Sequence, residues 1–242
     1  MSHKKADLDL SVVVLCYKAE HYVREFVQQI EKELAIEKIV NYELVLVANY
    51  SSDIQDGTPA IVKELASSNE KIKVVSQEKR GKMGWDMRSG LQAGTGKFIL
   101  VIDGDGQMPA SDIPLVYNII KNSEFDLVKT FRAKRFDGVY RTVLSRAYNL
   151  LFKLLFQPNF PVIDVNSKPK IIRKSVLDKM VLNSNDWFTD SEIMLQASLM
   201  NLKVCEVSSI FYHNKMRKSF VGFSTVIEFI FNLISYRFNL FR

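Results

Sequence analysis

Two carboxylates and a carboxamide lie close together near the middle of the sequence, where an apolar segment ends. Residues 98–102 are all apolar, and Asp103, Asp105 and Gln107 follow at alternate positions with glycines between them. Oxygen ligands grouped in this way favour a hard divalent cation. Mg²⁺ or Mn²⁺ would use one or two carboxylates and take its other ligands from water and a substrate diphosphate. The pattern therefore favours a site that holds a metal ion against a phosphorylated substrate.

Two other kinds of structure could contain the same acidic turn. An EF-hand calcium loop needs a glutamate at its twelfth position, but Pro114 occupies that position. A polar turn that leads into the next helix needs no more than these residues, because the two glycines relax the backbone there. On the Asp-Gly-Asp sequence alone, a structural turn without a metal therefore stays open.

A second segment combines cations with a hydroxyl group. Arg132, Arg135, Arg141 and Ser145 lie within residues 131–145, which we expect to form a loop and the start of a helix. A guanidinium group pairs with phosphate oxygens through a planar fork. A solvated basic loop is the alternative. We expect no binding to nucleic acid, because these cations do not alternate with aromatic residues suited to base stacking.

Asp190 has two possible roles. It precedes a segment in which Ile193, Ala197 and Met200 share one helical face. It could cap this helix, with Glu192 favoured by the helix dipole in the first turn. Alternatively, it could position an acceptor or remove the proton of an acceptor hydroxyl group. The residues alone leave both roles open.

Such residues meet only if the fold brings the ends of several strands together. Helical patterns separate five apolar, strand-like segments, at residues 10–16, 43–48, 72–76, 98–102 and 126–129. One apolar helix face lies between the first two segments and contains Tyr22, Phe26, Ile30 and Leu34. This alternation predicts an α/β fold with a mostly parallel, Rossmann-like sheet flanked by helices. Ligands bind such sheets at the carboxyl ends of the strands.

Composition narrows the class of partner. The chain has 242 residues, of which 47% are hydrophobic, enough for one large core or two modest ones. Its 33 lysines and arginines exceed its 27 acidic residues, and the net charge of +6 suits an anionic partner such as a nucleotide or a lipid phosphate. The polar N-terminal residues do not resemble a secretory signal, so we expect a cytoplasmic protein.

Four segments, in the right order, resemble glycosyltransferase family 2, whose members have the GT-A fold. Residues 12–20 resemble the family's first strand and Tyr-Asn-Glu motif, and residues 80–84 its Gly-Lys-Gly segment. Residues 103–107 match the Asp-Ala-Asp-Gly-Gln form of its metal motif. Residues 164–170 resemble the Asp-x-x-Ser-Gly-Phe/Pro-Lys segment beside its acceptor site. Within the family, the chain is similar to the dolichyl- and polyprenyl-phosphate sugar synthases.

This resemblance implies an inverting, metal-dependent glycosyltransferase that moves a sugar from a nucleoside-diphosphate sugar to a polyprenyl phosphate or another membrane-associated acceptor. By resemblance, the ligands of Mg²⁺ or Mn²⁺ are Asp103, Asp105 and Gln107. The donor would be bound by Tyr17, Glu20, Asn49, Lys82, Asp103, Arg132 and Ser145. The catalytic residues would be Asp105, Asp190 and Arg141. If the acceptor were a hydroxyl group of a surface glycan, Asp190 would be its base, whereas a phosphate acceptor needs none.

Asn49 departs from the family pattern. The second strand of the family usually ends in Asp-Asp-Gly-Ser, but here the sequence is Ala48-Asn49-Tyr50-Ser51. The carbonyl oxygen of Asn49 could accept a hydrogen bond from the nucleotide base, yet its amide is also a donor, so the base stays open. The change also raises the alternative of a catalytically degenerate, glycosyltransferase-like membrane partner. The retained metal motif argues against that alternative.

The C-terminal tail differs in pattern from the rest of the chain. We expect a GT-A domain over residues 1–218, with its nucleotide-sugar half ending at about residue 130 and its acceptor half covering residues 131–218. Residues 219–242 would form an amphipathic helix with a polar stripe of Ser224, Glu228, Asn232, Ser235 and Asn239. This stripe favours a helix in the membrane interface, or packed in a homo-oligomer, over a membrane span. We therefore expect peripheral binding at the inner face of the membrane.

Two other nucleotide-binding classes fit less well. Nucleotidyltransferases and nicotinamide-dependent dehydrogenases both carry a glycine-rich loop after the first strand. Residues 17–22 contain no glycine. A glycosyltransferase is therefore favoured over both.

Overall fold

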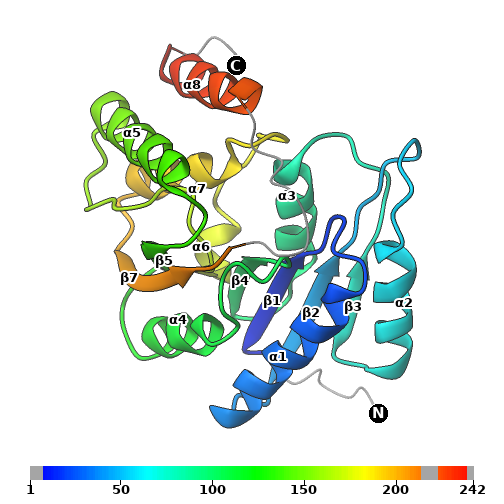
Figure 1. The fold of residues 1–242 in the computed structure, drawn as a ribbon. Coiled ribbons are helices and arrows are strands. Elements are labelled where there is room, and N and C mark those ends of the chain that lie inside the picture. The colour runs from blue at the N-terminus through cyan, green and yellow to red at the C-terminus, as the bar shows by residue number, and fades with distance from the viewer. Residues whose placement is uncertain (1–7, 214–222, 239–242) are drawn as a thin grey trace.

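A seven-stranded β-sheet runs through the protein in the order β3-β2-β1-β4-β6-β5-β7 (Figure 1). The computed structural model describes residues 8–213 and 223–238. The strands are β1 (Leu10–Leu15), β2 (Tyr42–Val47), β3 (Ile72–Val75), β4 (Phe98–Asp103), β5 (Leu127–Arg135), β6 (Lys170–Arg173) and β7 (Val204–Phe211). The helices are α1 (Tyr22–Ile36), α2 (Thr58–Ser68), α3 (Met83–Ala93), α4 (Asp112–Lys121), α5 (Val139–Phe156), α6 (Lys174–Leu177), α7 (Thr189–Leu199) and α8 (Phe223–Phe238).

The sheet is mostly parallel, as the alternation of strands and helices predicted. β1 pairs in parallel with β2 and β4, and β5 pairs in parallel with β7. β6 is antiparallel to both of its neighbours, β4 and β5. The parallel strands therefore end at the same edge, where the loops that follow them converge.

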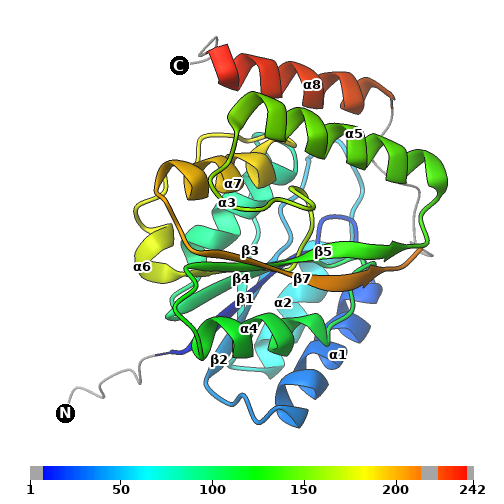
Figure 2. The same ribbon diagram turned by 90° about the vertical axis from the view of Figure 1, so that its left-hand side faces the viewer.

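Helices cover both faces of the sheet (Figure 2). Val12 and Val14 of β1 pack with α1, α2 and α4, whereas Val13 and Leu15 pack on the other face with α3, α5, α6, α7 and α8. Every residue of β1 is buried as a result. A strand covered on both faces reads as a continuous apolar run, which is why the sequence identified the central strands.

Close packing of α3 on the sheet depends on Gly90. A Cβ atom added there would lie 2.4 Å from the side chain of Val13 and 2.6 Å from that of Val47. Because α3 can approach β1 and β2 this closely, its first turn reaches the carboxyl ends of these strands.

The expected loop and helix start over residues 131–145 are confirmed except at residues 131–135, where the prediction of a loop is wrong. β5 continues through this segment to Arg135, and β7 pairs along it, with a register shift between Arg132 and Lys134. The side chains of this segment are polar, so the sequence does not show the apolar pattern of a strand. Its backbone forms hydrogen bonds with β7, which is distant along the chain. β6 and β7 are not among the five predicted strands, because β6 has only four residues, with cations at both ends, and β7 is only partly buried, although Cys205 of β7 lies in an apolar, strand-like run.

The expected C-terminal helix is present as α8, which lies beside α5 (Figure 2). Its stripe residues Glu228, Asn232 and Ser235 face the protein, and the last of these is fully buried. The side chains of Ser224 and Asn239, and the cationic residues 214–219 before the helix, lie outside the described part of the chain. Within that part, the helices are too short or too polar to cross a membrane.

Candidate active site

A cavity of about 730 Å³ opens at the carboxyl ends of the parallel strands. Of the site residues predicted from the sequence, its lining includes Tyr17, Lys82, Asp103, Asp105, Gln107, Arg132, Arg141, Ser145 and Asp190. These residues come from the ends of β1 and β4, from β5, and from the starts of α3, α5 and α7. The fold thus brings together nearly all of the predicted site.

Glu20 and Asn49 are the two predicted residues outside this lining. Glu20 is exposed, and its backbone N–H donates to Thr58 Oγ1 at 2.9 Å. Asn49 is fully buried, with its amide donating to Asp86 Oδ1 at 2.9 Å. Its carbonyl oxygen accepts the N–H of Gln77 at 3.0 Å. The oxygen that we expected to meet a base thus binds the protein's own backbone.

Asp86 lines the cavity beside Asn49 and was not predicted from the sequence. It lies in the first turn of α3, is 2% exposed and forms an ion pair with Lys79. Burial raises the pKa of the Asp86 carboxyl above its ordinary value, although Lys79 opposes this shift. The Lys79 ammonium also lies 3.9 Å from the ring centre of Tyr17. The sequence offers one signal for Asp86, namely that it is an acid at the start of a helix with an apolar face.

The turn after β4 carries the predicted metal ligands. Gly106 has a φ of +66°, and a Cβ atom there would lie 1.8 Å from the hydroxyl oxygen of Tyr22, so this position requires glycine. Asp105 Oδ1 accepts the backbone N–H of Gln107 at 3.2 Å. The Gln107 side-chain amide donates to the carbonyl oxygen of Tyr212 at 3.0 Å. These hydrogen bonds fix the turn at the carboxyl end of β4.

The donor atoms at this turn fit a divalent cation that is shared with a substrate. Among the described residues, no group of three or more His, Cys, Asp or Glu side chains could hold a metal ion alone. Mg²⁺ or Mn²⁺ needs only one or two carboxylates where a diphosphate and water supply the rest. Asp103 already attracts a cation, because Lys168 Nζ lies 3.2 Å from its Oδ2.

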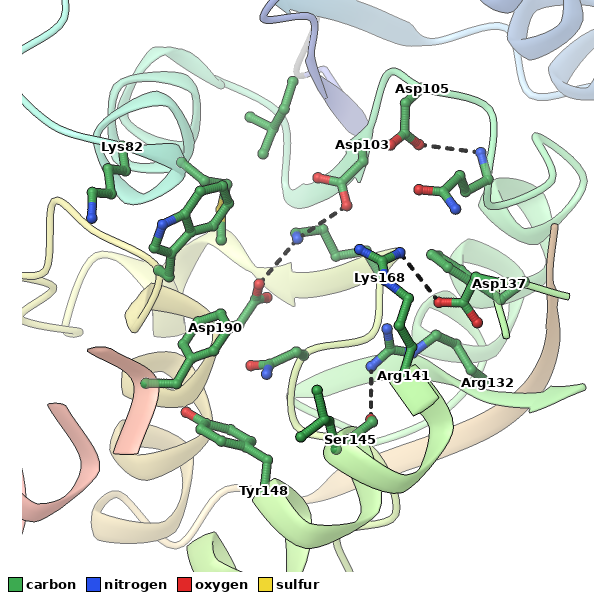
Figure 3. A pocket seen from close by; sticks show the side chains of 18 of the residues that line it. Lys82, Asp103, Asp105, Arg132, Asp137, Arg141, Ser145, Tyr148, Lys168 and Asp190 are labelled. Carbon is green, nitrogen blue, oxygen red and sulfur yellow. Dashed lines mark hydrogen bonds and ion pairs between the residues drawn. The ribbon is translucent and has the colours of Figure 1, made fainter. Parts of the chain in front are cut away.

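Asp190 belongs to a chain of buried charges (Figure 3). Lys168 Nζ lies 3.0 Å from one of its carboxylate oxygens, and Lys170 forms an ion pair with the other. All three residues are at most 3% exposed. Burial opposes ionisation of Asp190, but the two ammonium groups outweigh it and lower the pKa of this carboxyl below its ordinary value. The helix-cap role is wrong, because Phe188 occupies the N-cap position of α7 and no side chain caps it.

Arg132 is held by a carboxylate inside the site. Its guanidinium forms two hydrogen bonds with Asp164, at 2.6 and 2.7 Å, and a third with Ser145 Oγ at 3.3 Å. Burial opposes the charge on Asp164, but Arg132 holds the pKa of that carboxyl well below its usual range. Arg132 therefore reaches the cavity in a fixed orientation.

A second carboxylate organises the other two arginines. Asp137 accepts hydrogen bonds from Arg135 at 3.0 and 2.7 Å and from Arg141 at 3.4 Å. Burial acts against its charge, yet these arginines lower the pKa of the Asp137 carboxyl. Asp137 and Asp164 were missing from the predicted site, since the sequence does not tell which acids meet the arginines.

One wall of the cavity is apolar and was not predicted. Side chains from α5, α8 and the segment before α7 form it: Leu144, Tyr148, Leu151, Trp187, Phe229 and Ile230. The ring of Phe229 lies 5.5 Å from that of Tyr148 and 6.4 Å from that of Trp187, measured between ring centres. The cavity thus joins a charged end to an apolar side that α8 completes.

The sequence profile of the family described as Glycosyl transferase family 2 matches residues 11–181, which carry the strand ends, the arginines and the buried lysines of this site. The chain belongs to this family. It is 29% identical over 149 residues to the undecaprenyl-phosphate 4-deoxy-4-formamido-L-arabinose transferase of Pectobacterium carotovorum, covering 60% of the chain and 43% of that protein. It is 25% identical over 176 residues to the dodecaprenyl-phosphate galacturonate synthase of Rhizobium johnstonii, covering 72% of the chain and 51% of that protein. The matches thus span about half the length of these relatives.

Solved structures agree with the fold. Glucosyl-3-phosphoglycerate synthase from Mycobacterium tuberculosis, in complex with Mn²⁺, UDP-glucose and phosphoglyceric acid, superposes with a TM-score of 0.71 and 20% sequence identity. The match covers 96% of this chain and 81% of that one. This likeness confirms the GT-A type of sheet that the resemblance implied.

Proposed function

We propose that the protein transfers a sugar from a nucleoside-diphosphate sugar to a polyprenyl phosphate, with inversion at the anomeric carbon. The observation that carries this proposal is the two-sided cavity, in which arginines and carboxylates meet an apolar wall. Two relatives are named for undecaprenyl- and dodecaprenyl-phosphate substrates, which combine one phosphate with an apolar chain. The charged end suits the phosphates, and the apolar side suits the first isoprene units of the acceptor.

The surroundings of Asp190 favour a phosphate acceptor over a hydroxyl acceptor. A general base must be free to take a proton, and its pKa should be near the working pH. The Asp190 carboxylate instead forms ion pairs with Lys168 and Lys170, which lower its pKa. A phosphate oxygen is already anionic and needs no base. We therefore assign Asp190 the task of holding the two lysines in place.

In the proposed reaction, an oxygen of the acceptor phosphate attacks the anomeric carbon. The new bond to that oxygen forms as the bond to the donor diphosphate breaks, and the nucleoside diphosphate leaves. Asp103, Asp105 and Gln107 would hold a divalent ion, which offsets the charge on the leaving diphosphate. Arg132 and Arg141 would bind phosphate oxygens.

We also propose that α5 and α8 rest on the membrane that holds the acceptor. Val143, Ala147, Leu150 and Leu154 are exposed on α5 and recur at steps of four, three and four, so they share one face. On α8, Ile234 and Phe238 are 40% and 65% exposed. The exposed cations Arg146, Lys153 and Arg237 lie on the same helices, as expected for an anionic lipid surface.

Transfer assays with the full chain test the proposal. A thermal-shift screen of UDP, GDP, CDP and dTDP sugars with Mn²⁺ first identifies the donor, since specific binding stabilises the folded protein. Polyprenyl phosphate is then the acceptor. We expect Asp105→Ala to lower turnover by roughly 10²-fold or more while the melting temperature is preserved. The matched control is Asp178→Ala, which removes an acid whose side chain is 56% exposed.

Two results would contradict this assignment. One is full nucleotide-sugar binding and turnover by Asp105→Ala in the presence of metal. The other is parent activity that EDTA leaves unchanged.

A further inference from the structure

The ammonium group of Lys168 contacts Asp103, one of the three proposed metal ligands (Figure 3). Its Nζ is 3.2 Å from Asp103 Oδ2 and 3.0 Å from Asp190 Oδ2. Lys168 lines the cavity but is only 3% exposed, so its side chain has little contact with bulk water. The two ion pairs thus join a proposed metal ligand, Asp103, to the buried Asp190 through Lys168.

The two carboxylates differ in how much they depend on this lysine. Asp190 is fully engaged, because Lys170 contacts its second oxygen. Asp103 is more accessible, with a side chain that is 29% exposed at the cavity surface. A second cation therefore has more access to Asp103 than to Asp190.

A divalent cation on Asp103 would share that carboxylate with an ammonium group. Two cations on one carboxylate repel each other, and a buried setting screens this repulsion less than water does. A donor diphosphate carries negative charges that can offset the repulsion between the divalent ion and Lys168. A divalent ion that binds without the donor has no such charges beside it.

We propose that Lys168 occupies the metal site in the absence of donor and weakens the binding of a free divalent ion, so that the ion enters together with the donor diphosphate. This inference rests on the metal site of the proposed function. It gives Lys168 a task in ordering the binding steps, in addition to its contact with Asp190.

Titration with Mn²⁺ alone tests this proposal, with free Mn²⁺ followed by electron paramagnetic resonance and no nucleotide present. We expect Lys168→Met and Lys168→Gln to bind Mn²⁺ about tenfold more tightly than the parent, because the competing charge is gone. Lys168→Arg keeps the charge and should bind as weakly as the parent. Lys82→Met is the matched control, since it removes an equal charge from the same cavity, where its side chain is 49% exposed.

Both neutral variants should fold, because Asp190 keeps Lys170 as a partner and Asp103 reaches solvent. Adding Asp105→Ala to Lys168→Met should abolish the gain in affinity. The proposal is overturned if both neutral variants bind Mn²⁺ no better than the parent, if Lys82→Met gains as much, or if the gain survives Asp105→Ala. This test needs no turnover, so it can fail while the transfer assay still supports the proposed function.

Discussion

Asp190 shows how the surroundings of a residue set its chemistry. A sequence presents it as an acid near the start of a helix, free to act as a cap or a base. In the fold its two oxygens contact the ammonium groups of Lys168 and Lys170, and all three side chains are buried. Each of these three buried charges depends on an oppositely charged neighbour to offset the cost of its burial.

Replacing Asp190 by asparagine should therefore affect stability first. Asp190→Asn removes the carboxylate that Lys168 and Lys170 share, and burial already lowers the pKa of Lys170 to about 7. We expect the free energy of unfolding to fall by about 3 kcal/mol, because buried ion pairs are then broken. Urea denaturation at pH 7 measures this change. Adding Lys170→Met should recover much of the loss, since the buried amine that lost its partner is then gone. A single variant as stable as the parent would show that these ion pairs do not support the fold.

At the scale of elements, the position of the arginines depends on strand β5. It runs past its apolar part to Arg135 because β7 supplies backbone partners along its whole length. The register shift between Arg132 and Lys134 lies where the strand carries the cations. α5 then starts at Val139 and adds Arg141 and Ser145 to the same cavity, with Ser145 3.3 Å from the Arg132 guanidinium.

Helix α4 contributes a test of stability against pH. Asp112 in its first turn is 6% exposed and accepts a hydrogen bond from Ser209 of β7. Burial raises the pKa of this carboxyl from 3.8 to about 6, although Ser209 opposes the shift. The folded state thus binds a proton more tightly than the unfolded state. Stability contributed by this group is full below pH 4 and is lost as the pH rises through 6.

Asp112→Asn removes this penalty at neutral pH. We expect the variant to be more stable than the parent by about 2 kcal/mol at pH 7, allowing for the helix N-terminus, which favours the anion. At pH 4 the two proteins should differ little. Urea denaturation at both pH values checks this, and a gain of equal size at pH 4 would assign the effect to packing instead.

At the scale of the whole molecule, α8 differs from an ordinary surface helix, because polar side chains as well as apolar ones contact the protein. Asn232 donates to Asp186 at 3.1 Å, and Glu228 forms an ion pair with Lys82, the residue before α3. Other side chains of α8 are apolar and exposed: Ile230, Phe231, Ile234 and Phe238. The helix lies beside α5 (Figure 2), which also has an exposed apolar face. Exposed apolar surface of this kind commonly marks an interaction site.

Binding to anionic vesicles tests the role of this surface. Leu154→Ser combined with Phe238→Ser should weaken binding by roughly tenfold or more, because each change removes an exposed apolar side chain from the proposed contact. The matched control is Ile36→Ser with Val40→Ser, at the end of α1, where both side chains are also exposed. Co-sedimentation measures both pairs. An equal loss in the control, or no loss in the first pair, would refute a membrane contact through α5 and α8.

The sequence by itself determined the central strands, the α/β class and the position of the acidic turn after β4. These features are local or periodic. Strands buried on both faces are continuous apolar runs, and Asp103, Asp105 and Gln107 lie within five residues. The C-terminal helix was predictable for the same reason, from its own periodicity.

Only the tertiary structure decided which charges meet. Lys168 reaches Asp103 across 65 positions of sequence, and Asn49 reaches Gln77 across 28, so no local pattern records either contact. β7 turned a predicted basic loop into a strand through hydrogen bonds between distant backbones. The direction of the polar stripe on α8 was likewise set by distant partners in the segments before α3 and α7, Lys82 and Asp186. The energy of an ion pair or a hydrogen bond depends on the distance between its two groups in space. Residues that are far apart in the sequence come within that distance only when the chain folds.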